Sequence, residues 1–284
     1  SLLYRERIYQ TVAIEYPGAY LQFRFWMTGD FISSPQSSDP LVAGVRTAIL
    51  GSLWVILFTV IFAFPIGVGA AIYLEEYASG DRWINRVIQT NINNLAAVPS
   101  IIYGILGLTI FVRLLEPLTS GSIFGLSSST TANGRTILAG SMTLAILVLP
   151  IIIINAQEAI RAVPNSLRQA SYGLGATKWE TVWSHVLPNS IPGILTGTIL
   201  AISRAFGETA PLIVVGVSTY ITVDPVNMFS KFTTLPAQIY QWTARPQDEW
   251  RNLAAAAILI LLILLITMNA IAIVLRNKYS RKYA

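Results

Sequence analysis

The feature that most constrains this chain is a set of long apolar stretches separated by shorter polar segments. They fall at about 44–73, 91–113, 136–157, 190–216 and 253–275. A helix of about 20 apolar residues crosses the roughly 30 Å hydrocarbon core of a bilayer. Inside lipid the backbone must satisfy its own hydrogen bonds, so these stretches are expected to be helices. The sequence therefore predicts an all-α, polytopic membrane protein with five transmembrane helices.

Composition narrows the functions open to such a chain. Charged residues make up only 12% of the sequence, about half the share typical of soluble proteins. There is no cysteine, which excludes disulfides and thiol nucleophiles, and the single histidine, His185, excludes metal motifs built from paired histidines. No Gly-Lys pair occurs, so we expect no phosphate loop and no cofactor in this chain. The net charge of +5 suits anionic lipid headgroups better than nucleic acid.

Basic residues predict how the chain is oriented. The C-terminal tail, 276–284, carries four lysines and arginines, and basic segments favour the cytoplasmic side. In a transmembrane domain covering 44–275, alternation then places 158–189 in the cytoplasm and 217–252 outside. Residues 1–43 also fall outside, which predicts an extracytoplasmic loop and an earlier span missing from this chain. A natural N-terminus on the outside is the alternative.

The polar segment 161–188, between two apolar stretches, has the pattern of two helices joined by a turn. A short helix is expected over about 166–172, and Gly173 and Gly175 supply its stop. A polar helical hairpin between two membrane spans suggests a docking element for another protein.

The second helix of this segment has a clear start. Thr177 and Glu180 have the spacing of a capping box, so a helix is expected to begin at Lys178 and to end at Pro188. Apolar residues then share one helical face: Trp179, Val182, Trp183, Val186 and Leu187.

The same segment resembles the signature of the transmembrane subunits of ABC importers, Glu-Ala-Ala-x-x-x-Gly, nine residues and Ile-x-Leu-Pro. Four residues match it: Ala170, Gly175, Leu187 and Pro188. Three differ from it: Gln169, Ser171 and His185. The resemblance implies a six-span permease core, of which five spans are present, and a separate ATPase dimer that binds ATP and magnesium. The residues expected to contact that ATPase are Gln169, Ala170, Ser171, Gly173, Gly175, Thr177, Trp179 and Glu180.

Two charged residues lie within the fourth apolar stretch. Arg204 is roughly 20 Å along the helix that begins near Ser190, close to the bilayer midplane. An arginine there is costly in lipid, so it is expected to face protein or water. Glu208 lies four residues further on and can pair with it. We interpret the pair as part of a substrate path; a salt bridge that only fixes helix packing is the alternative.

Residues 207–212, Gly-Glu-Thr-Ala-Pro-Leu, resemble the motif of PstA-type permeases of bacterial phosphate importers. Further matches occur at 69–77, 97–104 and 171–179, so the resemblance covers about 40–284. It implies a subunit of the bacterial inner membrane that imports phosphate. The implied partners are a PstC-type permease, a PstB-type ATPase dimer and a PstS-type phosphate-binding protein outside.

The expected substrate path combines this motif with a second region. Besides Arg204 and Glu208 it includes Thr209. Pro99 can unwind the second stretch and turn backbone N–H groups toward an anion, with Asn94 and Ser100 beside it. A plain kink at Pro99 is the alternative.

Other functions remain open from the residues alone. An ABC importer of the same architecture could instead transport sulfate, molybdate or a phosphonate. A passive channel would not need the docking segment. An intramembrane hydrolase would need a base at membrane depth, and the only histidine lies in a loop.

Overall fold

The computed structural model describes residues 4–17, 25–78, 82–125 and 133–283, and every regular element within these ranges is a helix. The long helices are α3 (Arg46–Ile72, continued by the π-helical η2, Tyr73–Tyr77), α7 (Ile137–Arg161), α10 (Leu187–Gly207) and α13 (Asp248–Tyr283). Two elements lead into α10, namely α9 (Lys178–Thr181) and the π-helical η5 (Val182–Val186). The shorter helices are α1 (Arg5–Glu15), α2 (Gly29–Ser33), α4 (Trp83–Ala96), α5 (Ser100–Gly107), η3 (Leu108–Leu114), α6 (Glu116–Thr119), η4 (Ser122–Phe124), α8 (Asn165–Gly173), α11 (Ala210–Val215) and α12 (Leu235–Thr243).

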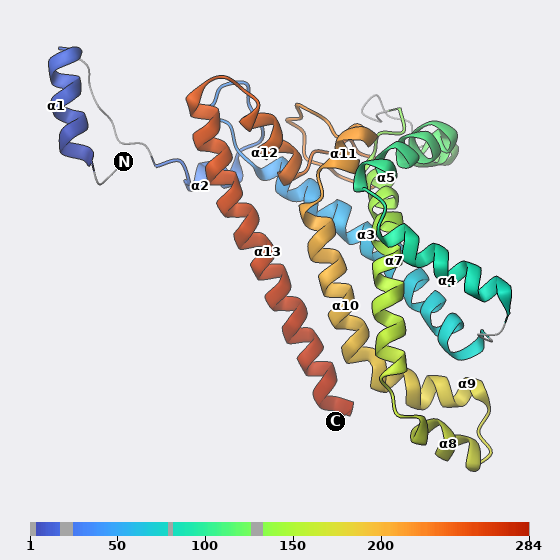
Figure 1. Ribbon diagram of the computed structural model, residues 1–284. Helices are drawn as coiled ribbons and strands as arrows, with labels where there is room; N and C mark the ends of the chain where they lie inside the picture. Colours follow the sequence, from blue (N-terminus) through green and yellow to red (C-terminus); the bar gives the residue numbers. More distant parts are fainter. Residues whose placement is uncertain (1–3, 18–24, 79–81, 126–132, 284) are drawn as a thin grey trace.

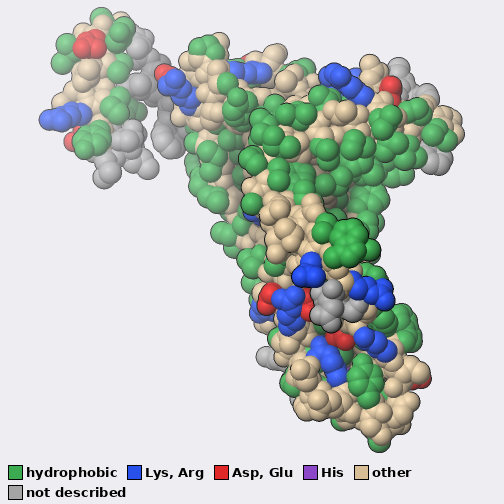
Figure 2. All heavy atoms as spheres, turned by 45° about the vertical axis from the view of Figure 1, so that its right-hand side comes forward, with side chains coloured by type: hydrophobic (Ala, Val, Ile, Leu, Met, Phe, Trp, Pro, Cys, Tyr) green, Lys and Arg blue, Asp and Glu red, His purple; other side chains and the backbone are tan. Residues whose placement is uncertain are grey.

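Among the described residues, four helices are long and apolar enough to cross a bilayer. They are Arg46–Tyr77, Ile137–Arg161, Lys178–Gly207 and Asp248–Lys278. A fifth crossing is made if the bent pair Trp83–Ala96 and Ser100–Leu114 counts as one span. Figure 2 shows a broad band of apolar side chains, with basic side chains above and below it. The predicted all-α, polytopic fold is confirmed.

The span predicted at 91–113 is broken near Pro99, where the sequence predicted an unwound helix or a kink. The chain turns through 105° between α4 and α5, and α4 begins at Trp83, well before the apolar stretch. Pro99 explains the bend. Its ring disfavours helical backbone in the residue before it, and it lacks the N–H that would continue the ladder. It therefore caps α5 instead of continuing α4.

The span predicted at 190–216 is also two helices. α10 ends at Gly207, and Glu208 takes extended backbone angles before α11 begins at Ala210. Pro211 accounts for the break, because in a continuous helix its ring would meet the carbonyl of Gly207.

The helix predicted to end at Pro188 continues through it, which corrects that boundary. The structure has one helix from Lys178 to Gly207. The π-turn just before Pro188, where Leu187 N–H donates to the carbonyl of Val182, absorbs the proline's missing hydrogen bond. As a consequence the second helix of the docking segment and the next span form one continuous helix.

Helix α7 lies at the centre of the molecule and packs against α3, α10, α4 and α5 (Figure 1). Within its most apolar window 72% of the residues are buried, compared with 6% for α13. Helices α10 and α7 can approach closely because residue 197 is glycine. A Cβ at Gly197 of α10 would meet the side chain of Asn155 on α7. Small residues at such crossings are typical of membrane helix packing.

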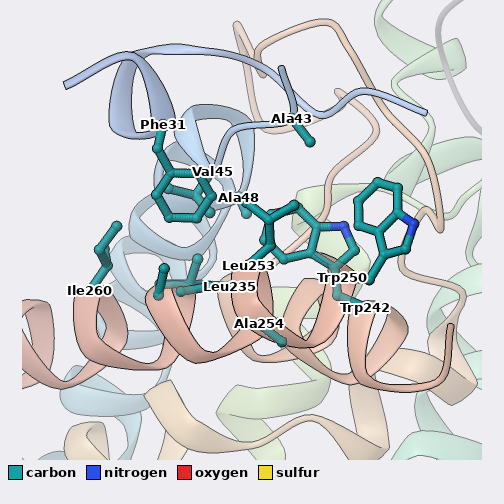
Figure 3. Packing of buried hydrophobic residues seen from close by; sticks show 12 residues of the cluster. Phe31, Ala43, Val45, Ala48, Leu235, Trp242, Trp250, Leu253, Ala254 and Ile260 are labelled. Carbon is teal, nitrogen blue, oxygen red and sulfur yellow. The ribbon is translucent and has the colours of Figure 1, made fainter. Parts of the chain in front are cut away.

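An aromatic cluster closes one end of the molecule (Figure 3). The fully buried Trp242 of α12 packs against Phe31 of α2 and Trp250 of α13, with ring centroids 6.1 Å and 5.8 Å apart. Gln36 extends the contact, because its amide bonds the backbone of Thr219 and of Ile221. The segments before α3 and between α11 and α13 therefore meet at this end, opposite α8, α9 and the C-terminus (Figure 1).

Candidate functional site

The polar hairpin after α7 is made by local sequence signals. Gly175 has φ +83°, in the left-handed region that favours glycine, and reverses the chain after α8. Thr177 then caps α9 through a full capping box. Glu180 N–H donates to Thr177 Oγ1 at 3.3 Å, and Thr177 N–H donates to Glu180 Oε2 at 2.7 Å. The helix–turn–helix geometry expected here is present, with α8 starting one residue earlier and ending one later than predicted.

The tip of this hairpin presents apolar side chains to the outside. Trp179 and Trp183 stack with ring centroids 5.5 Å apart, although each is about 60% exposed. Leu174, in the turn, is 91% exposed. Large apolar groups gathered on a surface mark an interaction site.

The hairpin residues predicted to contact an ATPase divide into two groups. Most lie on the exposed side: Gln169, Ala170, Gly173, Gly175, Thr177, Trp179 and Glu180. Ser171 is buried instead, and its hydroxyl shares a 2.8 Å hydrogen bond with that of Thr181. Its position makes it a brace between α8 and α9, so a direct contact to a partner is not expected from it.

Arg168 joins α8 to the rest of the molecule. Its Nη2 lies 2.7 Å from Oε1 of Glu76 in η2, and the same guanidinium donates to the carbonyls of Ile160 and Val163 at the end of α7. Both charged side chains are largely buried, with 15% of Arg168 and 6% of Glu76 exposed. One guanidinium thus ties α8 both to the end of α7, which directly precedes it, and to η2, which lies 92 residues away.

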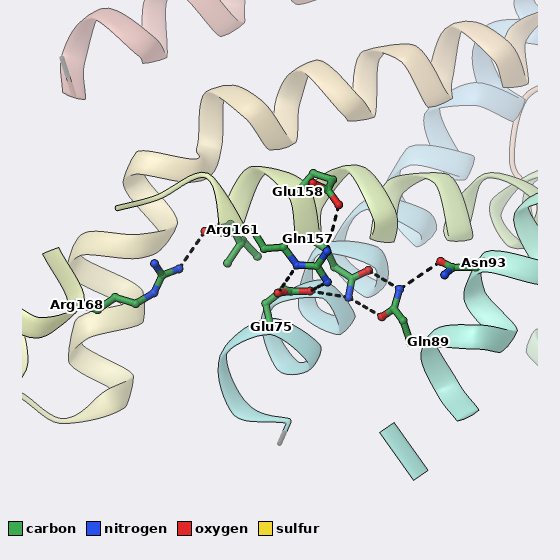
Figure 4. A network of polar contacts seen from close by, with 8 residues as sticks. Glu75, Gln89, Asn93, Gln157, Glu158, Arg161 and Arg168 are labelled. Carbon is green, nitrogen blue, oxygen red and sulfur yellow. Dashed lines mark hydrogen bonds and ion pairs between the residues drawn. The ribbon is translucent and has the colours of Figure 1, made fainter. Parts of the chain in front are cut away.

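A second ion pair continues this joint (Figure 4). Arg161 forms a fork with Glu75, Nε to Oε2 at 2.8 Å and Nη2 to Oε1 at 2.6 Å. Gln157 donates to the same carboxylate at 2.9 Å and bonds the amide of Gln89 on α4. We define the inner joint as Glu75, Glu76, Gln89, Gln157, Arg161 and Arg168.

Sequence reasoning did not find this joint. From the sequence, Glu75 and Glu76 are expected to be solvated or paired with the nearby Arg82 or Arg86, and the structure corrects this to Arg161 and Arg168. The true partners lie 86 and 92 residues away in sequence. The sequence does show two arginines in the docking segment, Arg161 and Arg168, but it does not indicate which carboxylates they contact.

Arg204 and Glu208 form a much looser pair. Arg204 Nε lies 3.5 Å from Glu208 Oε1, and the side chains are 52% and 19% exposed. Arg204 belongs to a stripe on one face of α10 that the described parts of the chain leave uncovered. The exposed residues of this stripe are Asn189, Gly193, Leu200, Arg204 and Gly207.

The two helix breaks come together in the structure. Gly104 of α5 lies against Pro211 of α11, so closely that a Cβ would be 2.7 Å from the Pro211 Cα. Tyr103 packs in the same cluster as Ala205 and Phe206 at the end of α10. Helix α5, which Ser100 begins, therefore packs through Tyr103 and Gly104 against the break that carries the Arg204–Glu208 pair.

The remaining predicted path residues lie at or near these breaks. Thr209 lies in the turn between α10 and α11, and its hydroxyl donates to the Gly207 carbonyl at a long 3.5 Å. Asn94 is exposed near the end of α4, one turn before the bend. No anion is present, so a role in substrate binding stays a prediction for all five residues.

Comparison with known proteins decides the family. Residues 63–282 match the family model described as the binding-protein-dependent transport system inner membrane component. The chain belongs to this family. It is 30% identical over 254 residues to the probable ABC transporter permease YqgI of Bacillus subtilis, covering 84% of this chain and 81% of that protein. It is 33% identical over 235 residues to the phosphate permease PstA of Yersinia pestis, covering 83% and 73%.

Solved structures agree in fold. A chain of a bacterial ABC transporter that imports alginate superposes with a TM-score of 0.63 at 17% identity, covering 97% of this chain and 90% of that one. The predicted resemblance to ABC importer permeases, and to the PstA type among them, is confirmed. This permease is therefore a multi-pass inner membrane subunit of an ABC importer.

Proposed function

We propose that this permease imports inorganic phosphate, as the PstA-type half of a translocation path that a separate ATPase drives. The observation that carries the proposal is the position of the Gly-Glu-Thr-Ala-Pro-Leu motif. It begins at the residue where α10 breaks, so that Arg204 and Glu208 flank a break against which α5 packs. The 33% identity to the Yersinia pestis phosphate permease supports the same cargo.

The chemistry of Arg204 suits this cargo. A guanidinium offers five N–H donors in a planar fork that matches the oxygens of phosphate. Its contact with Glu208 is long and half-exposed, so an incoming anion can replace the carboxylate at little cost. Glu208 then neutralises Arg204 whenever the path is empty, and no covalent chemistry takes place in this chain.

The continuous helix Lys178–Gly207 provides a mechanism for coupling. Its first turn carries Trp179 on the exposed hairpin, and its last turn carries Arg204. At 1.5 Å per residue these ends are roughly 40 Å apart. In the proposed cycle, ATP and magnesium bind to the ATPase dimer, whose closure moves the hairpin. The rigid helix transmits that movement to Arg204, and the path alternates between its two openings.

The proposal includes the partners and the orientation. A PstC-type permease covers the exposed stripe of α10 and supplies the other half of the path. A PstS-type binding protein delivers phosphate to the end formed by α2, α12 and the start of α13, outside the cell. The hairpin, 158–189, and the C-terminal tail then lie in the cytoplasm.

Orientation is testable because the chain has no cysteine of its own. Single cysteines at Thr243, the last residue of α12, and at Asn277, near the C-terminus, would be treated with a membrane-impermeant maleimide. In intact cells stripped of their outer membrane we expect Thr243→Cys to react and Asn277→Cys to react only after lysis. The opposite pattern would invert the proposed topology.

Transport itself is tested in vesicles that contain both permeases and the ATPase, with the binding protein added outside. We expect uptake of radioactive phosphate that needs ATP and is resistant to excess sulfate, molybdate or phosphonate. Competition by one of these anions as strong as that of unlabelled phosphate would assign the cargo to that anion. Anion flux without ATP would make the protein a channel.

A further inference from the structure

An open cavity lies at the end of the molecule opposite the hairpin. Its volume is about 900 Å³, and it lies between the end of η3, the residues just before α7 and the segment that follows α11. Its charged lining residues are Arg113, Glu116, Arg135 and Lys231. Three cations and one carboxylate leave an excess of positive charge around one hollow.

These charges are uncompensated within the described part of the chain. None of the four side chains takes part in the ion pairs found there, and all four are exposed. Other arginines of the chain, such as Arg161 and Arg168 of the inner joint, do meet carboxylates. Three free cations that come from separate segments and meet in one hollow therefore point to a mobile anion.

The position of Arg135 is built into the backbone. Gly216 ends α11 with φ +103°, and a Cβ there would lie 2.6 Å from Cδ and 2.8 Å from Nε of Arg135. Only glycine leaves room for this side chain over the turn. α11 has six residues between Thr209 and Gly216, so Gly216 is roughly 10 Å along the helix axis from Thr209 and the Arg204–Glu208 break.

We propose that this cavity is an entry vestibule that gathers phosphate before it reaches Arg204; the identity of the ion, though not the vestibule itself, rests on the proposed function. A volume of about 900 Å³ is far larger than one phosphate ion, so the cavity holds the anion hydrated and without tight selection. A hollow lined by one sign of charge focuses the field and raises local counter-ion concentration and capture rate. Ser218 and Thr219 add hydroxyl groups to the same wall.

The vestibule can be tested without transport. Thr219→Cys places a thiol in the cavity, in a complex whose partner subunits have had their cysteines replaced. Its reaction rates are measured with an anionic and a cationic methanethiosulfonate. We expect the anionic reagent to be favoured, and Arg135→Gln combined with Lys231→Gln to lower the anionic-to-cationic rate ratio by about tenfold. Arg251→Gln removes a basic side chain from the first turn of α13, away from the cavity, and is expected to leave the ratio unchanged.

Inorganic phosphate is the second probe. It is expected to slow modification of Thr219→Cys more than chloride does at equal ionic strength, and the Arg135→Gln, Lys231→Gln variant is expected to lose that protection. The vestibule would be overturned if the anionic-to-cationic rate ratio were unchanged in the double variant. It would also be overturned if phosphate protected Thr219→Cys from modification no better than chloride does. Weaker association of the binding protein, with phosphate protection intact, would also overturn it and make the surface a protein dock. Equal protection by sulfate together with failed phosphate uptake would refute the proposed cargo and leave the vestibule standing.

Discussion

The Arg168–Glu76 and Arg204–Glu208 pairs use the same two side chains in opposite ways. In the first, Nη2 and Oε1 are 2.7 Å apart, and two backbone carbonyls accept the remaining N–H groups. In the second, Nε and Oε1 are 3.5 Å apart and the arginine is half-exposed. The difference lies in burial and in the number of additional partners.

Burial decides what each pair can do. A buried pair cannot exchange its partner without leaving an unpaired charge in a poorly solvated site, so it acts as a permanent joint. An exposed pair gains little from its contact, so a passing anion can take the carboxylate's place. The inner joint therefore suits force transmission, and the Arg204–Glu208 pair suits transient binding.

The largest expected effect comes from breaking the buried pair. Arg168→Ala would leave Glu76 unpaired at 6% exposure, and we expect the free energy of unfolding to fall by about 3–5 kcal/mol. Unfolding in mixed detergent micelles measures it. Arg251→Ala is the control, because Arg251 and its partner Asp248 are 66% and 87% exposed, and about 1 kcal/mol or less is expected. Equal losses for the two variants would contradict the distinction between them.

Breaking the exposed Arg204–Glu208 pair is expected to affect transport strongly and stability little. Arg204→Ala should reduce ATP-dependent phosphate uptake by about a hundredfold, since a charged hydrogen-bonding group worth roughly 2–3 kcal/mol is removed. Its unfolding free energy should change by no more than about 0.5 kcal/mol. Arg204→Lys should restore part of the uptake, because it keeps the charge and loses the fork. Normal uptake by Arg204→Ala would exclude a role in the path.

A substitution in the turn of the hairpin is expected to have a smaller effect than breaking either ion pair. Gly175→Ala places a Cβ at φ +83° and should cost about 1–2 kcal/mol. Distortion of the turn should also raise ATP hydrolysis relative to phosphate uptake. Gly69→Ala is the control, because Gly69 lies within α3, outside the hairpin, and a Cβ there meets nothing within 4 Å. If both variants keep the normal ratio of uptake to hydrolysis, the hairpin is not the coupling element.

The smallest change removes the cap of α9. Thr177→Ala deletes the oxygen that accepts from Glu180 N–H, at a cost of about 1 kcal/mol. Thr177→Ser keeps that oxygen and should retain most of the stability. Hydrogen exchange of the amides of 178–181 is the readout, with faster exchange expected in Thr177→Ala alone. Equal protection in both variants would show that the cap does not hold this helix start.

Local patterns were predictable because their causes lie within a few residues. The capping box at Thr177 and the turn at Gly175 follow from neighbouring side chains and backbone angles. The helix breaks near Pro99 and Pro211 were harder to predict. Pro99 and Pro211 both lie in apolar stretches, yet Pro65 and Pro150 lie inside unbroken helices. A proline alone therefore does not tell a kink from the end of a helix.

By itself the sequence determined that the long apolar segments are helical and can cross a membrane, where the docking hairpin starts and turns, and which family the chain resembles. Only the tertiary structure decided that Glu75 and Glu76 meet Arg161 and Arg168, that the two breaks lie together, and that three unpaired cations face one cavity. The physical reason is the sequence distance over which each interaction acts. Hydrogen bonding and hydropathy act along neighbouring residues, whereas ion pairing between distant segments depends on how helices pack around α7.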